Sequence, residues 1–137
     1  MIPRYTIYTT YIVNLGILKN KEEIKLKISK ELLKGSTTMI ILNLLKDNNM
    51  YGYEMIKKLK EKSENVFELK EGTLYPILHT LEENGFIVSY WDESTAKKRK
   101  YYVITEKGKK QLKEKKEEWK LFSNGINQLL GGVSFAN

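Results

Sequence analysis

The sequence of 137 residues contains no cysteine and a single histidine, His79. The lack of thiols excludes disulfide bonds, thiolate-bound zinc and cysteine-based catalysis. The sequence also lacks a Ser/His/Asp spacing, a glycine-rich phosphate loop and a metal-ligand cluster. Glu82 and Glu83 are adjacent, so on a helix they point in different directions and make a poor acid/base pair. We therefore expect no enzymatic activity, no catalytic residues, no metal and no cofactor.

A long hydrophobic run is also missing. The first eighteen residues are apolar and aromatic, but Thr, Asn and Gly interrupt them. This stretch is too short and too polar to span a membrane, and it has no small-residue cleavage site of a signal peptide. We expect residues 1–27 to be an N-terminal extension, either a β-like arm or a disordered segment. We expect a cytoplasmic protein with no membrane partner.

Basic residues outnumber acidic ones. The 24 Lys and Arg residues against 17 Asp and Glu residues give a net charge of +7. On a small domain this excess favours a polyanionic partner, with nucleic acid as the first candidate and an anionic membrane surface as the second. A chain of this length is enough for one domain, and association with a second copy would help to stabilise its modest core.

Helical spacing of apolar residues predicts three helices in the first part of the chain. A single helix follows Ser29 as its N-cap, and its apolar positions cover most of its circumference, so we expect protein almost all around it. The second helix covers residues 52–62. The third lies within residues 72–84, with Thr73 as its cap, which makes Pro76 the third helical residue.

Two strands and a long helix follow. Residues 86–91 and 100–104 are rich in β-branched and aromatic side chains and predict a hairpin with a basic tip. Thr105 caps a last helix from residue 106 to about residue 130. Apolar residues recur along this helix at heptad spacing, which predicts pairing with a second copy. The predicted dimer-interface residues are Leu112, Trp119, Phe122, Ile126 and Leu129.

This order of elements predicts a mainly α fold with a β-hairpin. A winged helix-turn-helix domain would cover residues 28–105, and a C-terminal dimerisation helix would cover residues 106–131. In such a domain the polar face of the third helix enters the major groove of DNA, and the hairpin contacts a neighbouring phosphate or the minor groove. We therefore predict a homodimer that binds a double-stranded DNA operator.

The outward face of the third helix carries Thr73, Tyr75, His79 and Thr80. Their hydroxyl groups and imidazole can contact phosphates or base edges. Tyr75 is either a half-buried structural ring or a DNA contact, and its place in the first turn favours the DNA contact. His79 is either an ordinary surface residue or a DNA contact.

Four consecutive basic residues stand at the end of the predicted hairpin tip. Such a run either keeps a loop solvated or contacts phosphates, and its position beside a basic second helix favours phosphate contact. The predicted wing contacts are Lys97, Lys98, Arg99 and Lys100.

Trp119 falls on the apolar stripe of the last helix. The ring either fills the core of the dimer interface or, with its counterpart from the second copy, lines a slot for flat aromatic or cationic ligands. A small aromatic effector is therefore a further partner that we consider.

Several motifs, taken in order, resemble the PadR family of transcriptional regulators. The matching segments are ISKELLKGSTT at 28–38, YGYE at 51–54, GTLYPIL at 72–78, LEENG at 81–85 and RKYYVITEKG at 99–108. The resemblance covers about residues 28–130 and implies a homodimeric winged-helix repressor, in which the C-terminal helix packs against the first helix of the partner. It implies DNA contacts by Tyr53, by Tyr75 and by the basic residues of the wing.

The single short C-terminal helix resembles the small-tailed branch of this family, in which some regulators bind planar drugs between dimer-related tryptophans. The resemblance implies that Trp119 is such a tryptophan. The implied neighbours in that pocket are Leu32, Ser36, Met39 and Phe122. The alternative function is a winged-helix adaptor that binds protein, without sequence-specific DNA binding.

Overall fold

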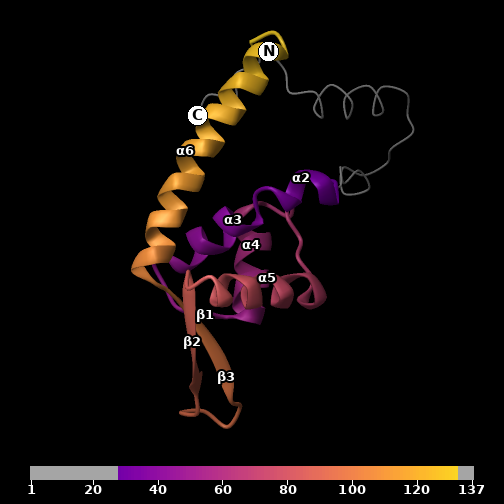
Figure 1. Cartoon of the computed structure of the whole chain (residues 1–137). Coiled ribbons are helices and arrows are strands. Elements are labelled where there is room, and N and C mark those ends of the chain that lie inside the picture. Colours follow the sequence, from indigo (N-terminus) through magenta and orange to yellow (C-terminus); the bar gives the residue numbers. More distant parts are fainter. Residues whose placement is uncertain (1–27, 133–137) are drawn as a thin grey trace, which may run out of the picture. The chain divides into compact units, whose positions relative to one another are not determined.

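The computed structural model describes residues 28–132 (Figure 1). The predicted extension at residues 1–27 lies outside this range. The described elements follow one another in a mainly helical order, which confirms the predicted fold class. They are α2 (Lys30–Lys34), α3 (Thr37–Leu45), β1 (Met50–Tyr51), α4 (Gly52–Lys62), α5 (Glu71–Glu83), β2 (Ile87–Asp92), β3 (Arg99–Ile104) and α6 (Glu106–Leu129).

The chain divides into two compact units, and the division falls within α6. Ile28–Trp119 forms one unit, which holds α2 to α5, the strands and the first part of α6. Residues 120–132 belong to the other unit. No described helix is long and apolar enough to cross a membrane.

The three strands form one antiparallel sheet in the order β1-β3-β2. β2 and β3 make the predicted hairpin, which we call the wing, and the register pairs Ile87 with Ile104 and Ser89 with Tyr102. Side chains alternate between the two faces of a sheet, so these four lie on the same face. β1 was not predicted, because two residues are too short to give a periodic signal.

A single core holds α3, α4, α5 and the start of α6 against this face of the sheet. Leu74 and Leu78 of α5 are completely buried, as is Ile87 of β2. Around these three lie the other buried apolar side chains: Ile41, Leu42, Leu44, Leu45, Met50, Met55, Leu59, Leu69, Leu81, Tyr102, Ile104 and Leu112. Because Leu112 of α6 is in this core, the first turns of α6 are part of the winged unit.

The predicted single helix after Ser29 is wrong, because two helices occupy this region. Ser29 does cap α2, and its Oγ accepts from the amide of Leu32 at 3.3 Å. Gly35 then ends α2, and Ser36 turns the chain by donating both its amide and its hydroxyl to the carbonyl of Leu33. α2 buries no residue, so the expectation of protein around the whole segment holds for α3 alone.

The predicted start of the third helix is also wrong. α5 begins at Glu71, and Lys70 is its N-cap, so Thr73 is the third helical residue and Pro76 is the sixth. The amide of Leu74 donates to the carbonyl of Lys70 at 2.9 Å, which shows that the first turn is formed before the proline. Pro76 removes only the bond that its own missing amide would make.

The strands of the wing extend one residue further toward the tip than predicted. Asp92 ends β2 and Arg99 begins β3, and the two residues pair across the hairpin. Both were predicted to lie in the loop. The shift matters because Arg99 is held by the sheet and is not part of a free tip, which consists of residues 93–98.

Thr105 caps α6 as predicted and also joins this helix to the end of α5. Its Oγ1 accepts from the amide of Gly108 at 3.0 Å and donates to the carbonyl of Gly85 at 2.7 Å. Lys107 Nζ donates to the carbonyl of Asn84 at 2.7 Å. A Cβ atom on Gly108 would overlap the carbonyl oxygen of Phe86. The glycine therefore allows α6 to start in direct contact with Phe86, just before β2, and with Ile104 at the end of β3.

Candidate nucleic-acid interface

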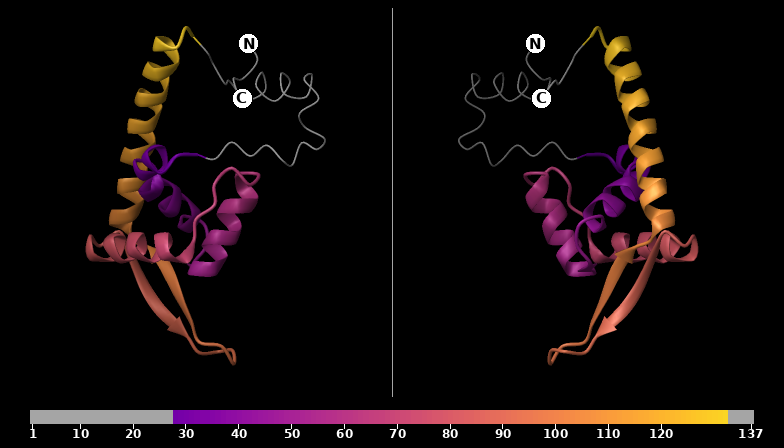
Figure 2. Two further views of the ribbon diagram at one scale, coloured as in Figure 1. Left: turned by 90° about the vertical axis from the view of Figure 1, so that its right-hand side faces the viewer. Right: turned by 90° about the vertical axis from the view of Figure 1, so that its left-hand side faces the viewer.

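The wing, α4 and α5 together frame one side of the first unit. α5 lies across the base of the hairpin, which extends away from the helices (Figure 1). Figure 2 shows that the hairpin bends toward the side on which α4 lies. The start of α4, the start of α5 and the wing tip therefore face a common space.

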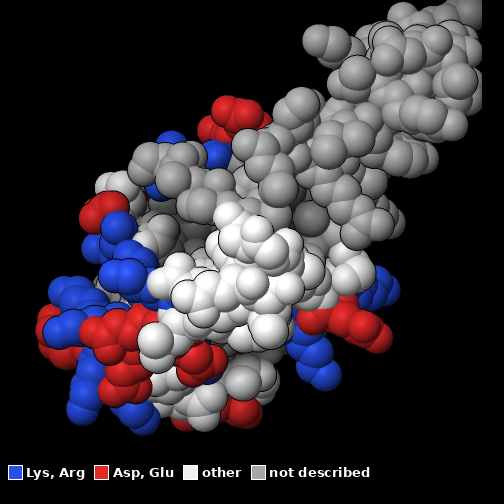
Figure 3. All heavy atoms as spheres, turned by 90° about the horizontal axis from the view of Figure 1, so that it is seen from above, with Lys and Arg blue, Asp and Glu red and all other residues white. Residues whose placement is uncertain are grey.

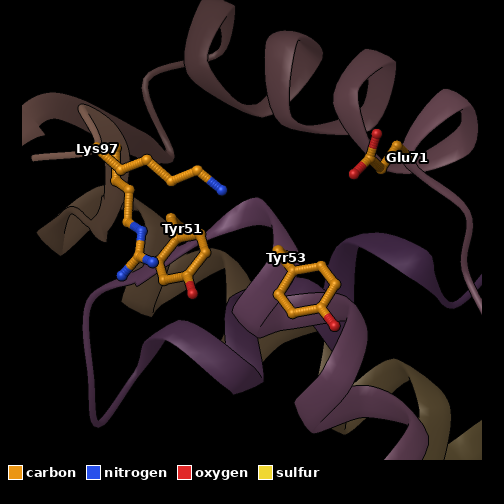
Figure 4. A pocket seen from close by; sticks show the side chains of 5 residues that line it. Tyr51, Tyr53, Glu71 and Lys97 are labelled. Atoms are coloured by element: carbon orange, nitrogen blue, oxygen red, sulfur yellow. The ribbon is translucent and has the colours of Figure 1, made fainter.

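Five side chains from these elements and from β1 line a cavity of about 400 Å³. They are Tyr51, Tyr53, Glu71, Lys97 and Arg99. Figure 4 shows Lys97 reaching from the wing and Glu71 from the start of α5, with the rings of Tyr51 and Tyr53 between them. The cavity thus combines two cations, two phenol groups and one carboxylate.

Arg99 is oriented by the aromatic side chains of the sheet. Its guanidinium carbon lies 4.6 Å from the centre of the Tyr51 ring. Tyr51 meets Tyr101 edge to face at 5.5 Å, and Tyr101 stacks on Tyr90 at 5.6 Å. A guanidinium that stacks on a ring keeps its edges for hydrogen bonds, and its fork of donors matches the oxygens of a phosphate.

Tyr75 connects α5 to the start of α4. A Cβ atom on Gly52 would lie 2.6 Å from the Tyr75 hydroxyl oxygen, so the ring packs directly on this glycine. The Tyr75 side chain nevertheless remains 45% exposed. The Tyr75 ring therefore packs on α4 and also leaves part of its surface exposed, and its contact with DNA stays a prediction. The packing of Tyr75 on Gly52 links the YGYE and GTLYP segments in space.

The other predicted residues of α5 lie on its outer surface. Thr73 and His79 are exposed, and neither lines the cavity. His79 Nε2 lies 3.0 Å from Glu83 Oε1, one turn along the helix. Tyr53, on α4, is 59% exposed and does line the cavity.

The four basic residues of the wing have different surroundings. Lys97 and Arg99 line the cavity, whereas Lys98 pairs with Glu93 at 3.3 Å on the exposed tip. Lys100 lies on the opposite face of the sheet from Arg99, with its Nζ 4.0 Å from Glu82 Oε1 on α5. The structure therefore brings together Tyr53, Lys97 and Arg99, and it separates Lys98 and Lys100 from them.

Two pKa values are shifted near this interface. Hydrogen bonds from the side chain and the backbone amide of Ser94 lower the pKa of Asp92 below its ordinary value, and Arg99 lowers it further. Burial raises the pKa of the Tyr102 hydroxyl, and the nearby Glu82 carboxylate adds to the shift. At neutral pH, Asp92 therefore carries its negative charge and Tyr102 is neutral.

The outer surface of α6 in the first unit has a different charge pattern. Lys109 Nζ lies 3.0 Å from Glu106, and Lys115 Nζ lies 3.6 Å from Glu118. Basic and acidic side chains lie side by side in the view of Figure 3. This surface offers a polyanion mixed charges, whereas two cations meet one carboxylate in the cavity.

The predicted interface and ligand residues of α6 are exposed, apart from Leu112. Trp119, at the end of the first unit, is 47% exposed. In the other unit, the predicted residues Phe122, Ile126 and Leu129 are also exposed, as are Leu121 and Leu130. Among the remaining predicted ligand neighbours, Leu32 is exposed, and Ser36 and Met39 are partly buried.

Sequence reasoning missed two of the five residues that line the cavity. Tyr51 lies in a strand of only two residues, and its role depends on a cross-strand partner, Tyr101. Glu71 lies outside the helix that the sequence predicts, because Thr73 is the predicted N-cap of that helix. An acidic residue in the first turn favours the start of a helix, and this signal could have placed Glu71 in the predicted helix.

The cations and phenol groups of the cavity can bind the oxygens of a phosphate diester. Arg and Lys donate charged hydrogen bonds to phosphate oxygens, and tyrosine hydroxyl groups add neutral ones. Among residues 28–132, no group of three or more His, Asp or Glu side chains could hold a metal ion.

Comparison with known proteins identifies the family. Residues 41–114 match the family model described as Transcriptional regulator PadR-like family. A solved structure of a transcriptional regulator from Clostridium thermocellum is 41% identical, with a TM-score of 0.69 and coverage of 72% of this chain and 97% of that chain.

Two relatives support the same assignment. An uncharacterized protein of Lysinibacillus sphaericus is 35% identical over 107 residues, which are 77% of this chain and 98% of that protein. The negative transcriptional regulator PadR of Bacillus subtilis is 32% identical over 73 residues, which are 53% of this chain and 40% of that protein. The chain therefore belongs to the PadR-like family, whose winged-helix members are transcriptional regulators and not enzymes.

Proposed function

We propose that this protein is a homodimeric repressor that binds a double-stranded DNA operator through α5 and the wing. One observation carries the proposal: Tyr53 of α4 and Lys97 and Arg99 of the wing line one cavity beside the start of α5. A helix beside a basic wing is the arrangement by which winged helices hold DNA. In this proposal, α5 enters the major groove and the cavity receives a backbone phosphate.

The proposed DNA contacts have graded roles. Lys97 and Arg99 bind phosphate, and Tyr53 adds a hydroxyl group from α4. Thr73, Tyr75 and His79 are the groups that α5 can offer to the groove, since all three are exposed. Lys98 and Lys100 contribute less, because each already has an acidic partner.

The dimer would form through the apolar residues of α6, of which Trp119, Phe122, Ile126 and Leu129 are exposed. Two joined copies would hold their α5 helices for half-sites about one turn of DNA apart, roughly 34–36 Å. Repression is the mode that the name of the Bacillus subtilis relative suggests. The assignment to the small-tailed branch and the cytoplasmic location stay predictions.

A flat aromatic effector is the proposed signal. It would bind between the Trp119 rings of the two protomers, with neighbours drawn from Phe122, Leu32, Ser36 and Met39. Such a ligand regulates DNA binding only if its affinities for the free and the DNA-bound dimer differ. The test is tryptophan fluorescence in a Trp91→Phe background, where Trp119 is the only remaining tryptophan. Quenching supports the slot, and no response to a broad set of flat ligands contradicts it.

Fluorescence anisotropy with labelled duplex DNA tests the function itself. The full chain is titrated onto the DNA upstream of its own gene and onto an unrelated duplex, at several salt concentrations. We expect tighter binding to the upstream DNA and a steep loss of affinity with salt, because cations of the protein replace counterions. Light scattering should give twice the protomer mass. Binding that is absent or insensitive to salt would favour the protein-binding adaptor.

A further inference from the structure

One carboxylate of α5 contacts both strands of the wing. Ser89 Oγ on β2 donates to Glu82 Oε2 at 2.6 Å. The other oxygen of the same group, Oε1, lies 4.0 Å from Lys100 Nζ on β3. The Glu82 and Lys100 side chains are only 32% and 38% exposed. Solvent therefore screens this pair less than it screens the pairs at the wing tip.

These groups lie where the wing leaves the helix. Ser89 pairs with Tyr102 across the hairpin, and Lys100 Nζ lies 5.7 Å from the centre of the Tyr102 ring. Ser89, Lys100 and Tyr102 share the sheet face that covers α5. The contact with Glu82 therefore restrains the direction in which the hairpin leaves α5.

A rotation of the wing at this contact would displace the wing tip. The tip begins at Glu93, four residues past Ser89, which is roughly 13 Å along an extended strand. A rotation of about 10° at the contact would move the tip by about 2 Å, enough to break a hydrogen bond to a phosphate. The direction restrained at Glu82 therefore affects the position of Lys97 on the tip and, to a smaller extent, that of Arg99, which is adjacent to Lys100.

Glu83 shows that the contact is specific to one of two adjacent carboxylates. Its Oε1 lies 3.0 Å from His79 on the same helix, and both side chains are well exposed. Both glutamates put negative charge on the proposed DNA-binding helix, where repulsion by phosphates opposes binding. Of these two glutamates, only Glu82 contacts the wing.

Building on the proposed function, we propose that Glu82 is a positioning residue for DNA binding. Together with Ser89 and Lys100, it sets the angle between α5 and the wing, so that α5 enters the groove while Lys97 and Arg99 reach the backbone. Lys100 thus contributes to the contact between α5 and the wing and does not bind a phosphate. Glu82 itself touches no DNA.

The first test compares two substitutions that remove the same charge from adjacent positions. Glu82→Ala should weaken DNA binding about tenfold, because the wing is no longer held at one angle. Glu83→Ala should leave the affinity within about twofold of the wild type, or raise it slightly. Equal effects of the two substitutions would mean that charge alone matters, and would overturn the proposal.

Ser89→Ala provides a variant with no change of charge. It removes one of the two wing contacts of Glu82 and should weaken binding about threefold. This variant also keeps the proposal testable if Glu82→Ala fails to fold. Wild-type affinity of a folded Ser89→Ala protein would contradict the proposal.

A double-mutant cycle separates positioning from general loss of structure. In a Lys97→Ala/Arg99→Ala background the wing has lost the contacts that Glu82 is proposed to position. There, Glu82→Ala should cost less than about twofold, so the effects are not additive. A full tenfold loss in this background would show that Glu82 does not act through the wing.

A distance measurement tests the contact between Glu82 and the wing in the absence of DNA. The chain has no cysteine, so spin labels can be attached to Thr95→Cys on the tip and Glu61→Cys on α4. With labelled protein diluted in unlabelled protein, the distance distribution should be narrow in the wild type, broad with Glu82→Ala and narrow with Glu83→Ala. An unchanged distribution in Glu82→Ala overturns this proposal alone. Failure of the wild type to bind DNA overturns the proposed function, whereas a broadened distribution in Glu82→Ala would still show that Glu82 sets the angle of the wing.

Discussion

The close contacts at Gly52 and Gly108, which we call the joints of the first unit, are stabilised differently from the wing tip. At the joints, Gly52 and Gly108 allow a ring and a backbone to approach more closely than any side chain would permit. At the tip, the Lys98–Glu93 pair is exposed, and Ser94 bonds to Asp92 within a turn. Exposed pairs contribute little to stability. The joints therefore fix the shape, and the tip keeps its charges for a partner.

The largest loss in the free energy of unfolding should come from Gly108→Ala. A Cβ atom there would overlap the carbonyl oxygen of Phe86 and crowd Ile104, so the start of α6 must move away from the sheet. Forced overpacking of this kind costs roughly 3 kcal/mol in the free energy of unfolding. Urea unfolding at a fixed protein concentration measures the loss.

Gly125→Ala is the matched control, because it lies in the same helix and nothing would meet its Cβ within 4 Å. It should raise the free energy of unfolding by up to about 1 kcal/mol, since alanine favours a helix more than glycine. If both substitutions had the same effect, the close contact at Gly108 would not be the cause.

Gly52→Ala should have the next largest effect. The new methyl group would lie 2.6 Å from the Tyr75 hydroxyl oxygen, so the ring must leave its place between α4 and α5. We expect a loss of about 2 kcal/mol in stability together with weaker DNA binding. Adding Tyr75→Ala should recover part of the stability but not the DNA binding. Gly72→Ala, which meets nothing within 4 Å, is the control.

At the wing tip, two adjacent lysines should differ in DNA binding and not in stability. Lys97→Ala should weaken binding about fivefold and lower the slope of affinity against salt by about one, because Lys97 lines the cavity. Lys98→Ala should change affinity by about twofold or less, since its partner is Glu93. A larger effect of Lys98→Ala would transfer the phosphate contact from the cavity to the tip.

The smallest effect concerns acid pH at the tip. Hydrogen bonds from Ser94 lower the pKa of Asp92 below 3.8 in the folded protein. The ionised form is thus stabilised at any pH above that ordinary value, and the stabilisation is lost as pH falls through the lowered pKa. In NMR, the Ser94 amide should titrate with a midpoint below 3.8, and Asp92→Asn should abolish the transition. A midpoint at or above 3.8 would contradict the bond.

The sequence predicted most of the fold because its signals were local. Helical periodicity gave the bounds of α4 correctly, and the caps at Ser29 and Thr105 are both present. The two helix errors come from local signals that the periodicity did not reveal. Gly35 and the hydrogen bonds of Ser36 end α2. α5 begins two residues before the expected cap at Thr73, with Glu71 in its first turn.

The candidate site was less accessible to sequence reasoning, because it depends on residues far apart in the chain. Charge alone grouped Lys97 to Lys100, but only the register of the hairpin separates Arg99 on one face from Lys100 on the other. Tyr51 depends on Tyr101 as a neighbour, and no periodic pattern in the sequence predicts that pair.

The salt dependence of DNA binding by the Lys97→Ala/Arg99→Ala double variant tests the central claim most directly. If the two cations in the cavity bind phosphates, the slope of affinity against salt should fall by about two relative to the wild type. The melting temperature should stay unchanged, because neither side chain belongs to the core. An unchanged slope in a fully folded variant would contradict the account.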